Sequence, residues 1–459
     1  MPAVLPERSV FEGPVLATFA RYAVPSLVGL VAISTASIVD GMFVSRYVGS
    51  NALAAVNLLL PYFTLLFGLA LMLAMGGSVH AGHALGAGDR AAASALFSKA
   101  LVAVVVLSSA AALLGNIHDG ALYRLLGAPP QLFPLMREYF RVISLAMVVQ
   151  LGSLVIYYFV RLDGRPALAT TAVVTGALAN IGLNALLVAG LGWGVGGAAY
   201  ATALAQLLQL AVLLSHFWSP QCRLRFGLVQ RRWSELWRSA FSGASELVNE
   251  VSVGVVALLL NWLLIGRVGV HGVAAFTVVN YATFASLMIY YGAADALHLL
   301  VSQNLGAGER ARARAFLGCA LGCVAGFGTL LAGALLLWGE HWLGLFIEDT
   351  RPEVMQQAAG FLRLTWPVLL LNGVNVVVTV FLAASLRPGL AGLLALSRSL
   401  VLPVSFLLLL AFGLPSLPFV LALPLAEAGT CLLGLTLLLR AEPDAPGRPP
   451  STDQQAVAS

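Results

Sequence analysis

Five carboxylates lie within long apolar stretches of the chain, where an ionised side chain is unfavourable. They are Asp40, Glu246, Glu250, Asp295 and Glu427. Placing such a charge at the centre of a bilayer costs on the order of 3 kcal/mol, so acids in these positions usually face a cavity or a pathway. The five residues are therefore candidates for binding a proton, another cation or a cationic substrate.

Asp40 is the strongest candidate of the five. A carboxylate that is sequestered from water favours its neutral form and can take up a proton at ordinary pH. The same group cannot hold both a proton and a cationic compound at full strength, and an exchanger needs this competition. The alternative is an aspartate that pairs with a backbone group or an arginine for packing alone.

Glu246 and Glu250 are one helical turn apart and so share a helix face. Two ionised carboxylates at this spacing repel, so at least one of them should favour its protonated form. This pair suits a proton acceptor or a partner for a substrate ammonium group. Alternatively, Glu246 lies at the cytoplasmic boundary, in contact with water and without a role.

Other polar residues within the apolar stretches are spaced to act together. Asp295 and His298 are three residues apart and so could form a proton-relay pair; the alternative is that His298 is merely packed. Asn180 and Asn184 share a helix face, and Thr202 lies in the next apolar stretch; the alternative for the two asparagines is interhelical hydrogen bonding worth about 1 kcal/mol.

The elements that position these residues are membrane-spanning helices. Of the 459 residues 59% are hydrophobic and only 10% are charged, and the mean hydropathy is +0.91, which excludes a soluble domain. Stretches long enough to cross about 30 Å of hydrocarbon recur along the chain. Twelve spans are predicted, at 20–46, 55–84, 94–116, 132–161, 167–189, 195–217, 237–267, 274–304, 311–339, 355–386, 389–411 and 417–440.

The basic residues of the connections predict the orientation. If the N-terminus is inside, most Lys and Arg residues of the connections lie inside, among them Lys99, Arg161 and Arg223. The segment 1–19 and both termini are thus expected to be cytoplasmic. A nucleic-acid partner is not expected despite the net charge of +5, because the basic residues are spread over loops without interleaved aromatic residues.

The chain contains an internal repeat. "LGAGDR" at 85–90 returns as "LGAGER" at 305–310, and Arg165-Pro166 matches Arg387-Pro388. Two copies of a six-helix unit are expected, related by an axis along the membrane normal: a lobe at 20–217, a cytoplasmic linker at 218–236 and a lobe at 237–440. The Gly-Ala-Gly sequence is expected to end one helix, with the acid starting the next; a phosphate-binding loop is excluded because no strand precedes it. The Pro-rich tail 441–459 is expected to be disordered.

Several longer motifs resemble the multidrug and toxic compound extrusion (MATE) family over nearly the whole chain. In chain order they are "SIVDGMFVSRYVGSNALAAV", "HALGAGDR", "RLDGRPALATTAVVTGALANIGLNALLVAGLGWGVGGAAYAT", "SQNLGAGER" and "FVLALPLAEAGT". The resemblance implies an all-α integral membrane fold with twelve transmembrane helices in two pseudo-symmetric six-helix lobes around a central cavity. It also implies export of mostly cationic, amphipathic compounds by alternating access, driven by inward H+ or Na+, with the bacterial inner membrane as the location.

The resemblance assigns roles to individual residues. It implies that Asp40 couples the cation, with Asn180, Asn184 and Thr202 beside it. Many members have an acid where this chain has Asn184, so a single carboxylate remains, which suits H+ better than Na+. Pro25 removes a backbone donor and is expected to let its helix bend, although a plain kink is the alternative.

The second repeat offers fewer matches to sodium-driven members. Glu250 resembles the seventh-span acid of those relatives. Their tenth-span acid has no counterpart, because Asn372 and Asn375 stand nearby instead. Glu246, Asp295, His298 and Glu427 are further candidates for ion or substrate binding in this half of the chain.

Two alternatives to multidrug export stay open. A flippase or exporter of a lipid-linked or polyphosphate-bearing precursor would use arginines in its cavity, and Arg398 is one candidate. An intramembrane enzyme is disfavoured, because neither GxSxG nor HExxH occurs. No cofactor beyond the coupling ion and no metal is expected; the four cysteines lack CxxC spacing and suit packing. The expected partners are small organic cations and the lipid bilayer, with the chain working as a monomer.

Overall fold

The computed structural model describes residues 10–220, 222–227, 233–268, 270–344, 352–414 and 416–440. These residues are almost entirely helical, and 12 helices in them are long and apolar enough to cross a membrane. The prediction of an all-α protein with twelve spans is confirmed. The first span starts at Val15, inside the segment that the sequence assigned to the cytoplasm. The predicted tail at 441–459 lies outside the described residues.

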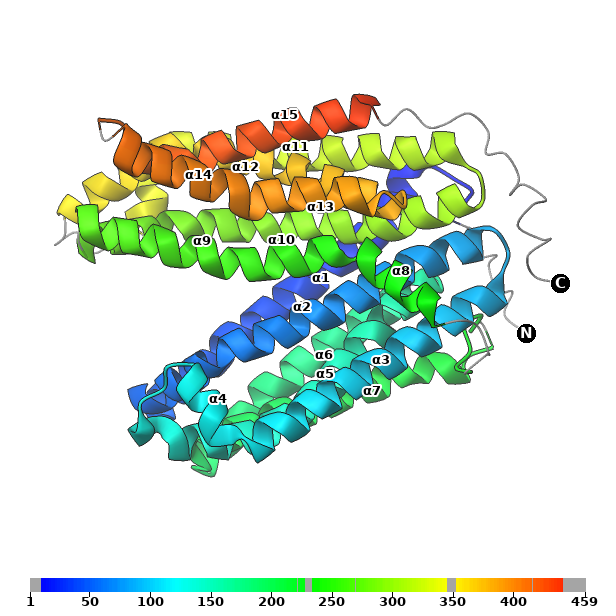
Figure 1. Ribbon diagram of the computed structural model, residues 1–459, viewed down its shortest axis with the longest axis horizontal. Helices are drawn as coiled ribbons and strands as arrows, with labels where there is room; N and C mark the ends of the chain where they lie inside the picture. The colour runs from blue at the N-terminus through cyan, green and yellow to red at the C-terminus, as the bar shows by residue number, and fades with distance from the viewer. Residues whose placement is uncertain are drawn as a thin grey trace.

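The first half of the chain forms one bundle (Figure 1). Its helices are α1 (Val15–Phe43), α2 (Ser50–Gly86), α3 (Arg90–Ile117), α4 (Asp119–Leu125), α5 (Phe133–Leu162), α6 (Pro166–Asn184) and α7 (Gly194–Leu214). Short π or 3-10 turns, η1 (Val44–Val48), η2 (Pro130–Leu132), η3 (Ala185–Gly190) and η4 (Ser215–Trp218), extend or join them.

The second half forms the other bundle, preceded by the short helix α8 (Ser234–Ser242), which packs on α2. Its helices are α9 (Ala244–Val268), α10 (Val270–Gly306), α11 (Arg310–Gly344), α12 (Pro352–Ala384), α13 (Pro388–Leu396), α14 (Leu402–Leu408) and α15 (Ala422–Arg440). The turns η5 (Ser397–Val401), η6 (Leu409–Gly413) and η7 (Phe419–Leu421) complete it.

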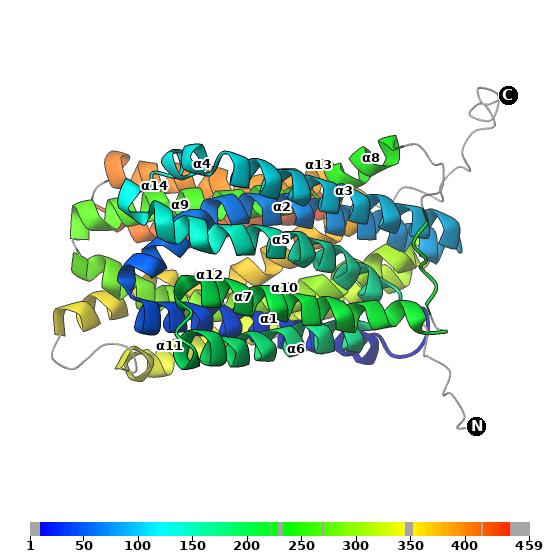
Figure 2. The ribbon, with the colours of Figure 1, turned by 90° about the horizontal axis from the view of Figure 1, so that it is seen from below.

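The two bundles meet at one end and diverge toward the other (Figure 1). The largest apolar core joins α2 to α10 and includes Ala74, Ala81, Leu297 and Leu300. At the opposite end each bundle has apolar clusters of its own, which do not combine residues of both halves. The helix α15 ends on the side where the bundles meet (Figure 1), and α1 begins on the same side (Figure 2).

Equivalent turns in the two bundles confirm the internal repeat. Gly88 and Gly308 have φ angles of 82° and 83°, and Gly164 and Leu386 have φ angles of 90° and 56°. The backbone hydrogen bonds repeat as well: the N–H groups of Gly164 and Leu386 donate to the carbonyls of Arg161 and Ala383, each at 3.1 Å. The two halves therefore follow the same path through the same turns.

The glycines of the repeated hexapeptide have two different roles. Gly88 adopts the left-handed conformation that ends α2, and the Asp89 side chain accepts a 2.8 Å hydrogen bond from the Ala92 N–H at the start of α3, as predicted. The preceding glycine, Gly86, lies in the helix against α10, where an added Cβ would be 2.1 Å from the Gln303 carbonyl oxygen. The prediction of a turn-forming role was therefore incomplete, because Gly86 allows two helices to touch.

Lys99 is not a loop residue, although it was included among the basic residues of the connections that predict the orientation. It lies within α3, its side chain is 3% exposed, and it donates to Glu235 of α8 at 3.2 Å. Close backbone contact also holds α8 on α2, since a Cβ on Gly243 would be 2.1 Å from the Met72 carbonyl oxygen. The short helix is thus fixed to the first bundle by an ion pair and by glycine packing.

Arg312 of α11 binds the segment that precedes α1. Its guanidinium donates to the carbonyl oxygens of Val10, Glu12 and Gly13 at 3.0, 2.9 and 3.0 Å, and it lies 5.3 Å from the centre of the Phe316 ring. Because α1 belongs to the first bundle and α11 to the second, this residue ties the two halves together at the joined end.

Candidate functional site

Two adjoining cavities lie between the bundles. One, of about 350 Å³, is lined mainly by α1, α2, α5, α6 and α7 of the first bundle. The other, of about 280 Å³, extends to α9, α10, α12, α13 and η5 of the second bundle. They adjoin, because they share seven wall residues: Ile33, Phe67, Gln150, Val173, Gln206, Gln209 and Glu250.

The three residues predicted to act with Asp40 form a single chain of hydrogen bonds with it. The Asn184 amide nitrogen donates to Asp40 Oδ1 at 2.8 Å and to Asn180 Oδ1 at 3.2 Å, and the Asn180 amide nitrogen donates to Thr202 Oγ1 at 3.1 Å. Three helices, α1, α6 and α7, supply the four residues. Asn184 is completely buried, whereas Asp40 is partly exposed on the cavity wall.

Neutral groups surround the Asp40 carboxylate. It forms no ion pair in the described part of the chain, and its side-chain hydrogen bond comes from the Asn184 amide. The Asn184 carbonyl oxygen is buried without a hydrogen-bond partner, so the spare acceptor of this network is an amide oxygen. The site therefore holds one carboxylate among amide and hydroxyl groups.

Pro25 lies inside α1 and is bound by the neighbouring helix. The Thr170 hydroxyl of α6 donates to the Pro25 carbonyl oxygen at 2.8 Å. On the following residue, the Ser26 hydroxyl accepts a short hydrogen bond from Arg161 and donates to the Tyr22 carbonyl oxygen at 2.9 Å. The proline that weakens the backbone ladder of α1 is thus next to a buried cation.

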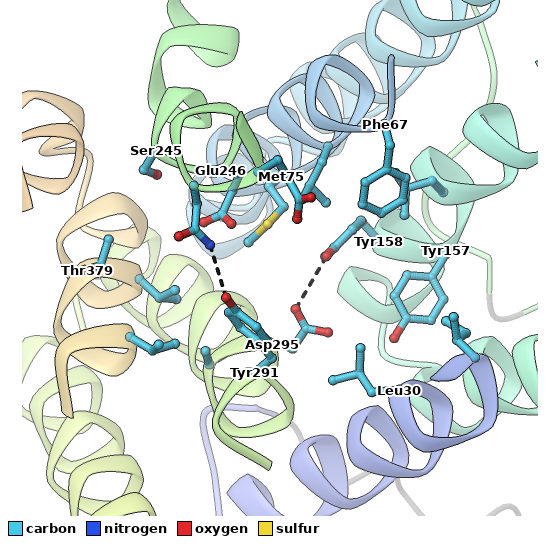
Figure 3. A pocket seen from close by; sticks show the side chains of 18 of the residues that line it. Leu30, Phe67, Met75, Tyr157, Tyr158, Ser245, Glu246, Tyr291, Asp295 and Thr379 are labelled. Carbon is cyan, nitrogen blue, oxygen red and sulfur yellow. Dashed lines mark hydrogen bonds between the residues drawn. The ribbon is translucent and has the colours of Figure 1, made fainter. Parts of the chain in front are cut away.

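Glu246 and Glu250 both line the central cavity from α9, and Glu250 reaches both parts of it. Figure 3 shows Glu246 near Met75 and Ser245 on the cavity wall. Within the described ranges neither glutamate forms an ion pair. The alternative of an idle Glu246 at the boundary is not favoured, because its side chain faces this space.

Glu427 of α15 is buried in the second bundle rather than exposed to the cavity. Its two carboxylate oxygens accept hydrogen bonds of 2.6 Å from the amide nitrogens of Asn372 and Asn375 on α12. Asn375 also donates to the Glu427 backbone carbonyl at 2.9 Å. The two asparagines therefore hold a carboxylate from another helix. The sequence showed them only as residues near the place of the tenth-span acid of sodium-driven relatives.

Asp295 has different partners from those predicted. It lies on α10 and pairs with Arg161 of α5, with 2.8 Å between Nη1 and Oδ2, and the Tyr158 hydroxyl is 3.5 Å from Oδ1 (Figure 3). His298 is buried edge-on to the Tyr158 ring, so the structure fits the alternative of a packed histidine and not the Asp295–His298 relay. Although they are only three residues apart on α10, the two side chains contact different neighbours.

Arg161 was counted among the loop cations, but it is the largest fully buried side chain and only 1% exposed. Its guanidinium contacts Asp295, Ser26 and the hydroxyl of Tyr157, the last at 3.2 Å. It thus forms an ion pair between the two bundles. This role could not be predicted from the sequence, because Arg161 immediately precedes the Leu-Asp-Gly-Arg turn and residues at helix ends are usually solvated.

A comparison with known proteins identifies the family. The model of the family described as MatE matches residues 25–186 and 250–414. The chain belongs to the MatE family. Members of this family are transporters rather than enzymes, and the 12 apolar helices make this one a multi-pass membrane protein.

Curated relatives of this MatE protein match it over most of their length. It is 25% identical to the FAD transporter of Shewanella oneidensis over 444 residues, covering 95% of this chain and 92% of the relative. It is 22% identical to the multidrug export protein MepA of Staphylococcus aureus over 431 residues, covering 93% and 94%.

Solved structures share the MatE fold. A crystal structure of MATE in complex with MaD3S has a TM-score of 0.86 at 21% identity and covers 95% of this chain and 99% of that one. A superfamily transporter from Pyrococcus furiosus, described as having a binding pocket of reverse polarity, has a TM-score of 0.85 at 22% identity, covering 95% and 98%. These likenesses confirm the twelve-helix architecture.

One polar cluster of this MatE protein lies outside the cavity and was not predicted. Buried Asp163 pairs with His216 at 2.8 Å and with Arg223 Nε at 3.0 Å, and Cys222 lies beside them. Burial and the Asp163 carboxylate raise the pKa of the Cys222 thiol, which donates to the Leu224 carbonyl oxygen. A protonated thiol and an arginine-bound carboxylate are poor metal ligands, so this cluster anchors the start of the connection between the bundles.

Proposed function

We propose that this chain is a secondary active multidrug exporter that exchanges inward cations, H+ rather than Na+, for organic and mostly cationic amphipathic compounds by alternating access. The observation that carries the proposal is the hydrogen-bonded chain from Asp40 through Asn184 and Asn180 to Thr202 on the cavity wall. The export of drugs by the relative named MepA supports the substrate class.

The surroundings of Asp40 favour H+ as the coupling ion. Asn184 directs an N–H group at the carboxylate, whereas a bound Na+ needs oxygen atoms directed at it. A lone carboxylate that faces a cavity can be neutralised by one proton and become charged again when the cavity opens to the other side. Asp40 would thus be the central titrating group, and Asn180, Asn184 and Thr202 would position it.

The charge of the cavity wall favours cationic substrates. Glu250 lines the same cavity as Asp40, Glu246 lines the adjoining one, and neither glutamate has an ion-pair partner among the described residues. Phe67 and Tyr158 supply aromatic surface beside them. A cation bound by these carboxylates would compete with protons for them, which couples substrate release to proton entry.

We further propose that both termini are cytoplasmic and that the protein lies in the bacterial inner membrane. In this orientation the joined end of the bundles is cytoplasmic, and the arrangement in Figure 1 opens toward the outside. The protein would work as a monomer and without a cofactor other than the coupling ion, because the cavity lies between two halves of one chain.

Export of a lipid-linked or polyphosphate-bearing precursor is the second candidate. Arg398 of η5 lines the cavity, and one relative is named as an FAD transporter, FAD being a dinucleotide with a diphosphate. The balance of charge disfavours this candidate. Arg161 is neutralised by Asp295, so among the described residues that line the two cavities one arginine without a direct ion pair faces three such carboxylates, Asp40, Glu246 and Glu250.

The deciding experiment is transport of a fluorescent organic cation in proteoliposomes with pH and Na+ gradients imposed separately. We expect efflux with the pH gradient alone, and loss of this efflux in Asp40→Asn while the protein still inserts. Asp119→Asn, which changes an acid outside the cavity, is the matched control and should transport normally. Unchanged efflux in Asp40→Asn, or efflux only with a Na+ gradient, would contradict the proposal.

A further inference from the structure

Arg398 is a charged residue of the cavity wall to which the proposed export of simple cations gives no role. It lies in the π turn η5, which follows α13 and directs its side chain toward the space between the bundles. π turns within helices often occur at functional positions. A cation facing a cavity that binds cations would weaken that binding unless it serves a purpose.

The position of the Arg398 guanidinium is fixed by a small polar network. Nη2 donates to Asn249 Oδ1 at 2.8 Å, and the Ser399 hydroxyl donates to the same oxygen at 2.6 Å. The Asn249 amide nitrogen donates to the Tyr291 hydroxyl at 3.1 Å. Asn249 is therefore held by three partners and orients the arginine from α9.

Arg398 has no carboxylate in direct contact among the described residues, although its charge interacts at longer range with those of Glu246 and Glu427. Across the described ranges it forms no ion pair, and its Nη1 atom is buried without a hydrogen-bond partner. Glu427 lies in the same bundle, but its oxygens accept from Asn372 and Asn375. Arg161 differs in this respect, since Asp295 pairs with it directly.

Both signs of charge thus face the cavity without a direct ion pair among the described residues. Arg398 and Glu246 line the same part of it, and Glu250 lines both parts. A compound with a single positive group would satisfy the glutamates and leave the guanidinium unpaired. A compound that also carries an anionic group would satisfy both, and an arginine fork suits a carboxylate or a phosphate oxygen pair.

We propose that Arg398 is a substrate-specificity residue and that the preferred substrates are amphoteric organic compounds, with a cationic group for Glu246 or Glu250 and a carboxylate or phosphate for Arg398. This inference rests on the proposed export function. It narrows the substrate class from cations in general to compounds that carry both charges. The guanidinium, held by Asn249, recognises the anionic group.

Two dyes that differ by one ester test this proposal. Rhodamine 19 has a free carboxylate beside its cationic ring system, and rhodamine 6G is its ethyl ester. Binding to the purified full-length chain is measured by fluorescence polarisation in detergent. We expect the free acid to bind more tightly than the ester, and Arg398→Gln to weaken the acid by about tenfold, as loss of one charged contact does, with the ester changed less than about twofold.

Matched variants separate recognition from folding. Arg398→Lys keeps the charge and should retain a preference for the acid, whereas Arg267→Gln, at the exposed end of α9 and not on the cavity wall, should bind both dyes as the wild type does. Glu250→Gln should weaken both dyes. Each variant is checked for a monodisperse elution profile before binding is measured.

The outcomes distinguish this proposal from the proposed function. If the wild type binds the ester but not the acid, or if Arg398→Gln weakens both dyes equally, the role of Arg398 in recognising an anionic group is wrong while export of cations stands. If the wild type binds neither dye, the proposed function fails and this inference fails with it.

Discussion

Gly86 of α2 and Gly306 of α10 lie against each other's helices at the joined end of the bundles. A Cβ on Gly86 would be 2.1 Å from the Gln303 carbonyl oxygen, and one on Gly306 would be 2.2 Å from the His83 carbonyl oxygen. Each position contacts backbone, which cannot rotate away. The repeated hexapeptide thus places one glycine from each half of the chain at the same helix crossing.

Replacing either glycine with alanine should separate α2 from α10 at this end. We expect Gly306→Ala to lower the thermal unfolding temperature in detergent, because the added methyl group overlaps backbone atoms. Gly318→Ala on α11 is the control: its Cβ would meet nothing within 4 Å, and the substitution should be neutral or raise stability by about 0.5–1 kcal/mol. Equal unfolding temperatures for the two variants would show that the crossing is not close.

The Arg161–Asp295 ion pair should be much more sensitive to removal of one partner than to removal of both. Asp295→Asn leaves a guanidinium that is 1% exposed without its counter-charge, which costs about 3–5 kcal/mol for a buried pair. The double variant Arg161→Gln with Asp295→Asn should recover part of this loss. Thermal unfolding of the two single variants and the double variant measures the coupling.

The exposed pair Arg137–Asp119 is the control for this cycle, because solvent screens it. Asp119→Asn should change the unfolding temperature far less than Asp295→Asn does. If the two substitutions had equal effects, the buried pair would contribute no more than a surface contact.

Asn184→Asp should create sensitivity to Na+. The substitution places a second carboxylate within hydrogen-bond distance of Asp40, and two adjacent negative charges attract a cation. We expect NaCl to raise the unfolding temperature of this variant relative to choline chloride, and not that of the wild type. Asn180→Asp, one step further along the hydrogen bonds, should respond less. A wild type stabilised as strongly by Na+ would contradict the preference for H+.

Glu427→Gln should destabilise the second bundle. Both carboxylate oxygens accept from asparagine N–H groups, and a glutamine would turn its own NH2 group toward one of these donors. The expected cost is about 1–3 kcal/mol, the usual penalty for a buried unsatisfied donor. Glu353→Gln at the exposed start of α12 is the control. Thermal unfolding of both variants in detergent would check this, and a stable Glu427→Gln would show that the carboxylate is not needed as an acceptor.

The spans and the repeat could be predicted from the sequence because they depend on local hydrophobicity and on residues that recur at fixed spacing. The Asn180–Asn184 pair could be predicted in the same way, since residues four apart share a helix face. Contacts between distant helices have no such local signal. Arg161 stands at the end of α5 and Lys99 lies in the first half of α3; the sequence alone placed both among the cations of the connections, yet both are buried against partners from other helices.

Partner choice at the candidate site was the least predictable feature. Asp295 and His298 are close in sequence, but Asp295 pairs with a residue of the other bundle. Asn372 and Asn375 donate hydrogen bonds to Glu427, a contact that depends on the packing of α15 against α12. A helix face can be inferred from spacing, whereas the helix that packs on it depends on the whole fold.

The contact of Arg312 with residues 10, 12 and 13 involves main-chain oxygens only. Every amino acid offers the same carbonyl group, so the attachment does not depend on which side chains the segment carries. In a saturation mutagenesis library, codon 12 should therefore tolerate diverse replacements, while codon 312 should accept few. Codons 10 and 13 are restricted for separate reasons, since Val10 is buried in the apolar core and Gly13 has a φ of 81°.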